Sequence, residues 1–96
     1  YDPSATAKNL TAVTLPALQQ VHQHLAQLSD WTAAAIHTVI EQTATDLNVK
    51  LGMVAQPIRV AMTGNTISPP IDITLELLGK VKVLHRLELA IQFIQK

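Results

Sequence analysis

The segment from residue 56 to residue 71, QPIRVAMTGNTISPPI, holds the side chains best suited to binding chemistry. The guanidinium of Arg59 is a planar fork of donors that can bind a base edge or a phosphate at two points. On a helix, Arg59 shares a side face with Ala55 and Thr63, small residues that let another backbone approach closely. Both helix–helix packing and the approach of an RNA loop fit such a face, and the residues alone leave the choice open.

The loop that follows Gly64 ends in Ser68-Pro69-Pro70, ahead of a new apolar stretch. The prolines stiffen the loop, and Ser68 with Pro69 is typical of an N-cap followed by a first-turn proline. The unpaired N–H groups of a helix start accept phosphates or base carbonyls. The same residues are also common helix punctuation, so the loop indicates a binding site only together with its surroundings.

The four histidines show no metal-binding spacing and are expected to be solvated on helix surfaces. They are His22, His24, His37 and His85. The chain has no cysteine, which excludes disulfides and thiolate metal sites. We therefore predict no metal site.

Asp72 and Glu76 lie four residues apart, a spacing that would place two carboxylates on one helix face. A catalytic pair needs a pocket and perturbed pKa values, for which the sequence gives no sign. Asp72 better fits a first helical turn, where it favours the helix dipole. Without a glycine-rich phosphate loop or a nucleophile motif, we predict no catalytic residues in this chain.

Composition limits the classes of partner. The formal net charge is zero, which is poor support for nucleic-acid binding, but six of the seven Lys and Arg residues follow residue 48, so an anionic partner would prefer the second half. Apolar runs are too short for a membrane span, and nothing resembles a signal peptide, so the expected location is the cytoplasm. The start at Tyr1-Asp2-Pro3 suggests a cut within a longer chain.

Apolar periodicity predicts helices that would position these residues. One stripe runs over residues 14–28, and a second helix over residues 32–48 begins at Thr32 as N-cap, with Trp31 packing beside it. A third, over residues 54–63, contains Pro57 and ends at Gly64, which suits a left-handed cap. Residues 1–13 are predicted to be the tail of a preceding helical region, and residues 14–96 the domain itself.

The last third fits two patterns. Apolar and polar residues alternate over residues 71–77 and 87–93, which would allow a hairpin turning at Gly79-Lys80. A helix over residues 70–95, broken at Gly79, also fits, and its Leu, Glu, Lys and Gln content favours it. In the helical interpretation Leu84, Leu87 and Ile91 share a face and belong to the core.

Several motifs resemble one family. The stretch LGMVAQPIRVAMTG over residues 51–64, Ser68-Pro69, ELLGK over residues 76–80 and Arg86-Leu87 resemble the final domain of bacterial glutamyl-tRNA synthetases, which are class I aminoacyl-tRNA synthetases. Upstream, Trp31-Thr32 followed by Ile36 resembles the start of the family's preceding helix. The likeness is strongest over residues 47–90, and the combination QPxRxAxTG…SP is specific to this family.

The resemblance implies an all-α, compact anticodon-binding domain of the helix-cage type, part of a larger multidomain chain, and it favours helix for the last third. In that family the QPxR arginine and the SP loop face the anticodon. Carried over by position, the RNA-binding residues are Arg59, Ser68, Pro69 and Ile71, with Thr66 and Ile67 in the same loop. The cations Lys80, Lys82 and Arg86 are expected to attract phosphates.

Two positions depart from the family pattern: Pro70 stands where glycine is usual, and Asp72 where an apolar residue is frequent. The aromatic residues Tyr1, Trp31 and Phe93 lie outside the loop, so base stacking on aromatic rings is not expected. Readout would instead depend on hydrogen bonds, prolyl faces and aliphatic contacts.

The implied partner is the anticodon stem-loop of tRNA(Glu), bound as part of a ligase that attaches glutamate to tRNA using ATP. The HIGH and KMSKS-like signatures are absent, so the ATP, Mg²⁺ and glutamate sites would lie upstream of Tyr1, and this chain should hold no cofactor. We expect a monomer without DNA or membrane partners. The alternative is a neutral helical module for protein interaction or structure, without RNA binding.

Overall fold

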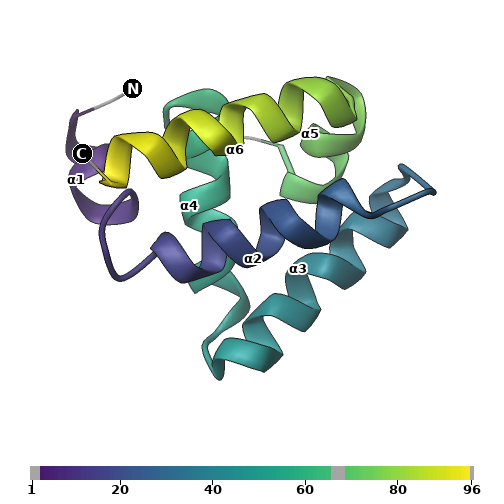
Figure 1. Cartoon of the computed structure of the whole chain (residues 1–96), viewed down its shortest axis with the longest axis horizontal. Coiled ribbons are helices and arrows are strands. Elements are labelled where there is room, and N and C mark those ends of the chain that lie inside the picture. Colours follow the sequence, from purple (N-terminus) through teal and green to yellow (C-terminus); the bar gives the residue numbers. More distant parts are fainter. Residues whose placement is uncertain (1–2, 66–68, 96) are drawn as a thin grey trace.

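The computed structural model describes residues 3–65 and 69–95. In these ranges the chain forms six helices and no strand (Figure 1). They are α1 (Pro3–Asn9), α2 (Leu15–Ala26), α3 (Ala33–Leu47), α4 (Leu51–Thr63), α5 (Ile71–Leu78) and α6 (Lys80–Gln95). The all-α prediction is confirmed, and the alternative hairpin at Gly79 is wrong. Gly79 instead separates two helices with a positive φ of 87°, a conformation that glycine adopts without steric cost.

Most helix ends form at the predicted signals. The Thr32 hydroxyl accepts the N–H of Ala35 at 3.2 Å and caps α3, as predicted. Left-handed residues end α3 at Asn48 and α4 at Gly64, where the Gly64 N–H donates to the Val60 carbonyl. These local devices fix the lengths of the two helices that border the site described below.

Helix α4 begins at Leu51 rather than at residue 54, and it continues through Pro57. The missing N–H of Pro57 leaves only the carbonyl of Met53 without its helical partner. Met53 is half exposed in the first turn, so water can satisfy that carbonyl, while the Pro57 ring is buried among apolar neighbours. The cost of the proline is therefore low enough for the helix to include it.

Helix α5 begins later than the Ser68 N-cap prediction would place it. Its first residue is Ile71 and Pro70 occupies the N-cap position, with φ −46° and ψ 135°. A residue that precedes a proline disfavours the helical conformation, so Pro69 cannot join the helix. The Thr74 hydroxyl donates to the Pro70 carbonyl at 3.1 Å and fixes this first turn.

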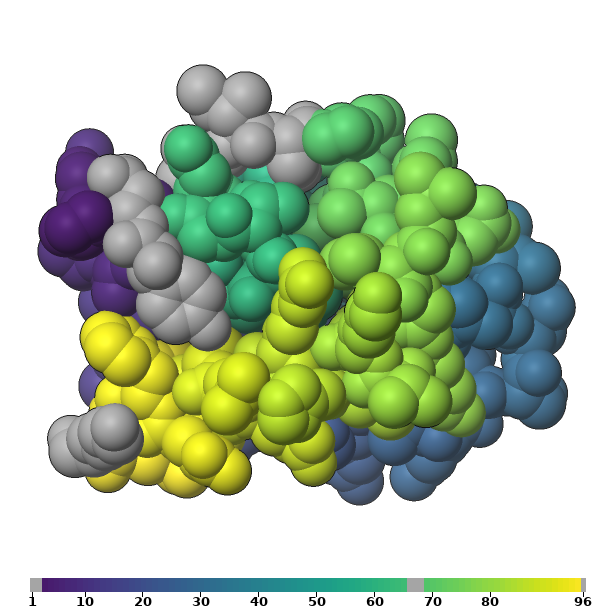
Figure 2. All heavy atoms as spheres, turned by 90° about the horizontal axis from the view of Figure 1, so that it is seen from above, coloured from purple at the N-terminus to yellow at the C-terminus, as the bar shows by residue number. Residues whose placement is uncertain are grey.

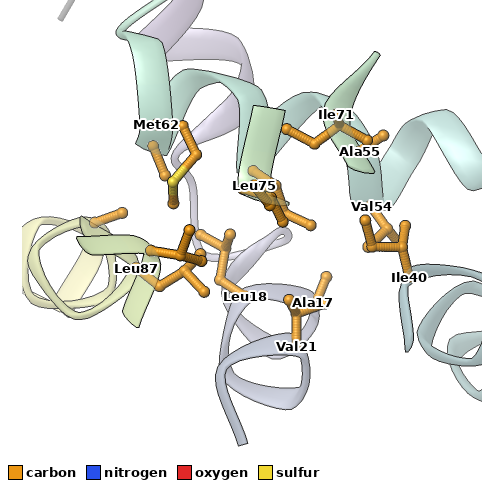
Figure 3. Close-up of a cluster of buried hydrophobic side chains, with 14 of the residues drawn as sticks. Ala17, Leu18, Val21, Ile40, Val54, Ala55, Met62, Ile71, Leu75 and Leu87 are labelled. Carbon is orange, nitrogen blue, oxygen red and sulfur yellow. The ribbon is translucent and has the colours of Figure 1, made fainter. Parts of the chain in front are cut away.

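One hydrophobic core joins all the described helices, and Figure 3 shows side chains that α2 to α6 contribute to it. Its largest fully buried side chains include Leu18, Leu25, Ile36, Ile40, Ile58, Leu75 and Leu87. Leu87 is 0% exposed, and Leu84 and Ile91 pack partly buried against the cluster, as the predicted face requires. The division at residue 14 stays a prediction, and Ala5 and Leu10 from the predicted tail lie in the same core.

Helix α4 is the central element. It packs against each of the other described helices, while α2 lies between α3 and α6 (Figure 1). Seen from above, α5 and α6 cover one long side of the surface, and side chains of α4 reach the surface between α1 and α5 (Figure 2). The QPIR residues 56–59 therefore stand on the helix that the rest of the fold holds in place.

Candidate nucleic-acid interface

A groove of about 440 Å³ lies where α3, α4 and the start of α5 meet. We call it the α3–α4–α5 groove. Its lining residues are His37 and Ile40 from α3; Leu51, Gly52, Ala55 and Arg59 from α4; and Pro70, Ile71 and Asp72 from the start of α5. Two of the residues predicted to bind RNA, Arg59 and Ile71, thus come together, and Ile71 and Ala55 can be followed in Figure 3.

Two small residues of α4, Gly52 and Ala55, line this groove together with Arg59, whereas Thr63 does not. Ala55 is buried at its edge, and a Cβ added at Gly52 would meet no atom within 4 Å. Thr63, one turn after Arg59, is exposed, and its hydroxyl donates to the Arg59 carbonyl at 2.9 Å. Packing within the chain therefore does not fill this face at Gly52, and an outside molecule can approach the α4 backbone there.

A histidine and two carboxylates adjoin the groove on the α3 side. His37 Nε2 lies 3.3 Å from a Glu41 carboxylate oxygen, and His37 Nδ1 lies 3.8 Å from Asp72 Oδ2. His22, in α2, lies 3.6 Å from the carboxylate of Glu88 in α6. His37, with 44% of its side chain exposed, lies on the helix surface as predicted, although Glu41 and Asp72 are beside it. His22 departs from the prediction, because its side chain is 27% exposed and its Nε2 is buried.

Asp72 and Glu76 do not act as a pair. Asp72 lies in the first turn of α5, as expected, and its Oδ1 accepts the Ile73 N–H at 2.9 Å. Glu76 points to the start of α3, where its carboxylate accepts the Ala33 N–H at 2.8 Å. One carboxylate borders the groove, and the other caps a neighbouring helix.

Three long-range hydrogen bonds tie the α2–α3 connector to the end of α5 and the start of α6. They run from Trp31 Nε1 to the Leu75 carbonyl (3.1 Å), from the Ala33 N–H to Glu76 (2.8 Å), and from Lys80 Nζ to the Leu28 carbonyl (2.7 Å). We call this set the clasp. It holds the carboxyl end of α5 in place, and thereby fixes where the amino end of α5 meets the groove.

The three cations predicted to attract phosphates have different surroundings. Lys80 belongs to the clasp, and Arg86 Nη1 donates to the Met62 carbonyl in the last turn of α4 at 2.6 Å. Both therefore satisfy backbone carbonyls near helix ends. Lys82 is exposed, and in the described ranges its side chain forms no hydrogen bond or ion pair. Phosphate attraction by these residues stays a prediction.

The predicted binding loop is only partly visible in the site. Thr66, Ile67 and Ser68 lie outside the described residues. Pro69 is exposed, and its carbonyl accepts the Thr74 hydroxyl at 3.3 Å. Among the predicted loop residues, Ile71 is therefore the one whose place in the groove is described.

Sequence reasoning missed the contribution of α3 to the site. The spacing of His37 and Glu41, four residues apart, was the available signal, but nothing local shows that α5 packs across α3 at this point. In the part of the chain that the structure describes, no group of three or more His, Asp or Glu residues could hold a metal ion. No helix there combines the length and the apolarity that crossing a membrane requires.

Comparisons with known proteins show the family of the chain. The sequence matches the family described as "Anticodon binding domain" over residues 1–91. It is 51% identical over all 96 residues to glutamate–tRNA ligase 2 of Coxiella burnetii and 48% identical to glutamate–tRNA ligase 1 of Alkalilimnicola ehrlichii. The chain spans only a fifth (20%) of each of these relatives.

A solved structure shows the same fold. It is a crystal structure of a glutamate tRNA ligase from Elizabethkingia meningosepticum in complex with its amino acid. The match has a TM-score of 0.91 at 24% identity and covers 98% of this chain and 18% of that chain. The relatives confirm the likeness to glutamyl-tRNA synthetases that the motifs indicated. On the evidence of its full-length sequence matches and its helical architecture, the chain belongs to the anticodon-binding domain family.

Proposed function

We propose that this chain recognises the anticodon stem-loop of tRNA(Glu) as part of a glutamate–tRNA ligase. The observation that carries the proposal is the α3–α4–α5 groove, which joins Arg59 of the central helix to Ile71 at the start of α5. Membership of the anticodon-binding domain family and the identity of the relatives support the same conclusion.

The lining of the groove suits an unstacked base. The exposed side chain of Leu51 offers aliphatic surface to the face of a base, while Ile40 and Ile71 are buried lining residues, and Gly52 leaves room for the base to enter. Single-stranded loops are read by splaying bases out and hydrogen-bonding their edges. The Arg59 guanidinium supplies donors for such an edge. Among the described lining residues there is no Phe, Tyr or Trp, and the aromatic ring is the imidazole of His37.

The site stands on helices that are fixed by packing. Residues Ile58 and Leu75, beneath the two walls, are fully buried, and the clasp ties α5 to the α2–α3 connector. Binding groups held by a rigid scaffold do not have to be ordered when the ligand arrives, which favours discrimination between similar bases.

The chemistry of aminoacylation would lie elsewhere in the ligase. This chain covers a fifth of its relatives, and we assign ATP, Mg²⁺ and glutamate binding to the remaining part, with no catalytic residue or cofactor here. Lys80, Lys82 and Arg86 would add sequence-independent attraction to RNA phosphates. We expect the ligase to act in the cytoplasm, and this part of it to bind RNA as a monomer.

The decisive test compares Arg59→Ala with the unaltered full-length protein. Binding is measured to the cognate anticodon stem-loop and to stem-loops with a changed anticodon, at two salt concentrations. Because a guanidinium that reads a base edge contributes roughly 1–3 kcal/mol, Arg59→Ala should weaken cognate binding by that amount and reduce discrimination. Lys8→Ala, which removes an exposed charge on α1, is the matched control.

The outcome separates three functions. Equal weakening of cognate and changed stem-loops would make Arg59 a phosphate contact only. No change in either would favour the alternative function, a neutral helical module for protein interaction or structure. Loss of discrimination with Arg59→Ala, and none with Lys8→Ala, would establish anticodon readout from this groove.

A further inference from the structure

The α3–α4–α5 groove contains an acidic side chain that a surface built only for phosphates would avoid. Asp72 lines it together with Arg59, and its side chain is 26% exposed. A carboxylate repels a phosphate at close range, but it accepts hydrogen bonds from the N–H groups of bases. A cation and an anion in one groove therefore suit the edge of a base better than the RNA backbone.

The two oxygens of Asp72 have different surroundings. Oδ1 accepts the Ile73 N–H at 2.9 Å, which fixes the carboxylate at the start of α5. Oδ2 lies 3.8 Å from His37 Nδ1, a separation longer than a hydrogen bond. An ionised carboxylate can accept about four hydrogen bonds in all, so Oδ2 has the capacity to accept another from a ligand in the groove.

His37 limits where the carboxylate of Asp72 can lie. Its Nε2 is 3.3 Å from Glu41, one turn further along α3, and its other ring nitrogen faces Asp72. Glu41 does not line the groove, whereas His37 does. The imidazole ring of His37 therefore lies between the carboxylate of Glu41, outside the groove, and that of Asp72, inside it. His37 would affect a ligand by holding Asp72 in position.

The hydrogen-bonding groups on the edge of a base decide which base fits the groove. We propose that Asp72, positioned by His37, makes this groove selective for a base with an exocyclic amino group, and among pyrimidines for cytosine over uracil. The amino group of cytosine donates to a carboxylate, whereas uracil would place a carbonyl oxygen against it. Arg59, on the facing helix, supplies donors for the base's own carbonyl. This inference rests on the proposed function and adds the class of base that the groove takes.

The test uses the full-length protein and anticodon stem-loops that differ by C or U at one of the three anticodon positions. At one position the unaltered protein should prefer C by roughly five- to 150-fold, the range that one specific base contact provides. Asp72→Asn should reduce this preference to a few-fold, because an amide can turn either a donor or an acceptor toward the base. Glu88→Gln removes a carboxylate of α6 that lies beside His22 and outside the groove, and it should leave the preference unchanged.

A chemical probe gives a second measurement that does not depend on the stability of a variant. N4,N4-dimethylcytosine at the selected position has no amino hydrogen. It should therefore lose affinity for the unaltered protein by a larger factor than for Asp72→Asn. His37→Gln should lower the C-over-U ratio partway while the Tm stays close to that of the unaltered protein, which a merely structural role for His37 would not produce.

The outcomes distinguish this inference from the proposed function. If Asp72→Asn keeps the C-over-U ratio at all three positions, or tightens binding to every stem-loop alike, the inference is wrong and anticodon recognition through Arg59 stands. If dimethylation costs both proteins the same factor, the amino group does not meet Asp72 and the inference is again wrong. If the unaltered protein binds none of the stem-loops, the inference and the proposed function fail together.

Discussion

The two ends of α5 differ in how their polar groups are used. At the carboxyl end, the Leu75 carbonyl and the Glu76 carboxylate are hydrogen-bonded to the α2–α3 connector. At the amino end, Ile71 and Asp72 border an open groove, and Asp72 Oδ2 can still accept a hydrogen bond. In this helix of eight residues, polar groups at the carboxyl end are hydrogen-bonded within the chain, whereas Asp72 at the amino end can still accept a hydrogen bond.

The comparison shows how a short helix can support a binding site. An isolated helix of this length is marginal in water, so its geometry must come from tertiary contacts. Leu75 is fully buried and the clasp lies beside it, so the orientation of α5 is set at the end away from the groove. The amino end can then keep polar capacity for binding without losing its position.

The largest expected effect comes from truncating a side chain of the hydrophobic core against which α5 packs. Leu87→Ala should lower the free energy of unfolding by roughly 2–5 kcal/mol, as truncation of a fully buried leucine does. Leu77→Ala, at a side chain that is 80% exposed, is the control and should change little. Urea unfolding of both variants measures the difference. A loss under half a kcal/mol for Leu87→Ala would contradict the packing in Figure 3.

A smaller effect should follow from removing one hydrogen bond at the carboxyl end of α5. Trp31→Phe keeps an aromatic ring but removes the indole N–H that donates to Leu75, so we expect a loss of about 1 kcal/mol in stability. If the clasp positions the groove, Trp31→Phe should weaken binding of the cognate RNA. The loss of affinity should be larger than the share of unfolded variant in the sample can account for. Thermal unfolding and stem-loop titration of the same sample would check this, and unchanged stability would show that this hydrogen bond of the clasp contributes nothing.

The smallest effect is expected at Lys82, a charged residue that lies at neither end of α5. Lys82→Ala should leave the Tm unchanged and weaken every stem-loop alike, with the slope of log affinity against log salt reduced by about one. Lys80→Ala should instead lower the Tm, because Lys80 Nζ is bonded to the Leu28 carbonyl. A change in anticodon preference with Lys82→Ala would show that the separation between readout and phosphate attraction is wrong.

The helices were largely predictable because their signals are local. Thr32, Asn48, Gly64 and Gly79 cap or break the chain through their own backbone and side-chain chemistry. The start of α4 was predicted too late because the cost of Pro57 depends on its burial, which is a tertiary property. The start of α5 was predicted too early because Pro69 precedes another proline, and that restriction outweighs the capping tendency of Ser68.

The site was less predictable because its walls come from three helices. Arg59 and Ile71 were assigned through family motifs, whereas His37 enters only because α3 packs against α5. Lys80 and Arg86 look like solvated cations in the sequence, yet both donate to carbonyls far away along the chain. Local patterns carry no information about which distant carbonyl a long side chain will reach.

The packing of α2 against α6 has a consequence for synthesis of the protein. The buried residues of α2, Leu18, Val21 and Leu25, belong to a helix that packs against α3, α4 and the last described helix, α6. A ribosome adds roughly 5–20 residues per second, so α2, α3 and α4 leave it several seconds before α6 does. During that interval α2 can pack against α3 and α4 but not against α6, so the part of its apolar face that α6 covers stays exposed until α6 emerges and completes the core.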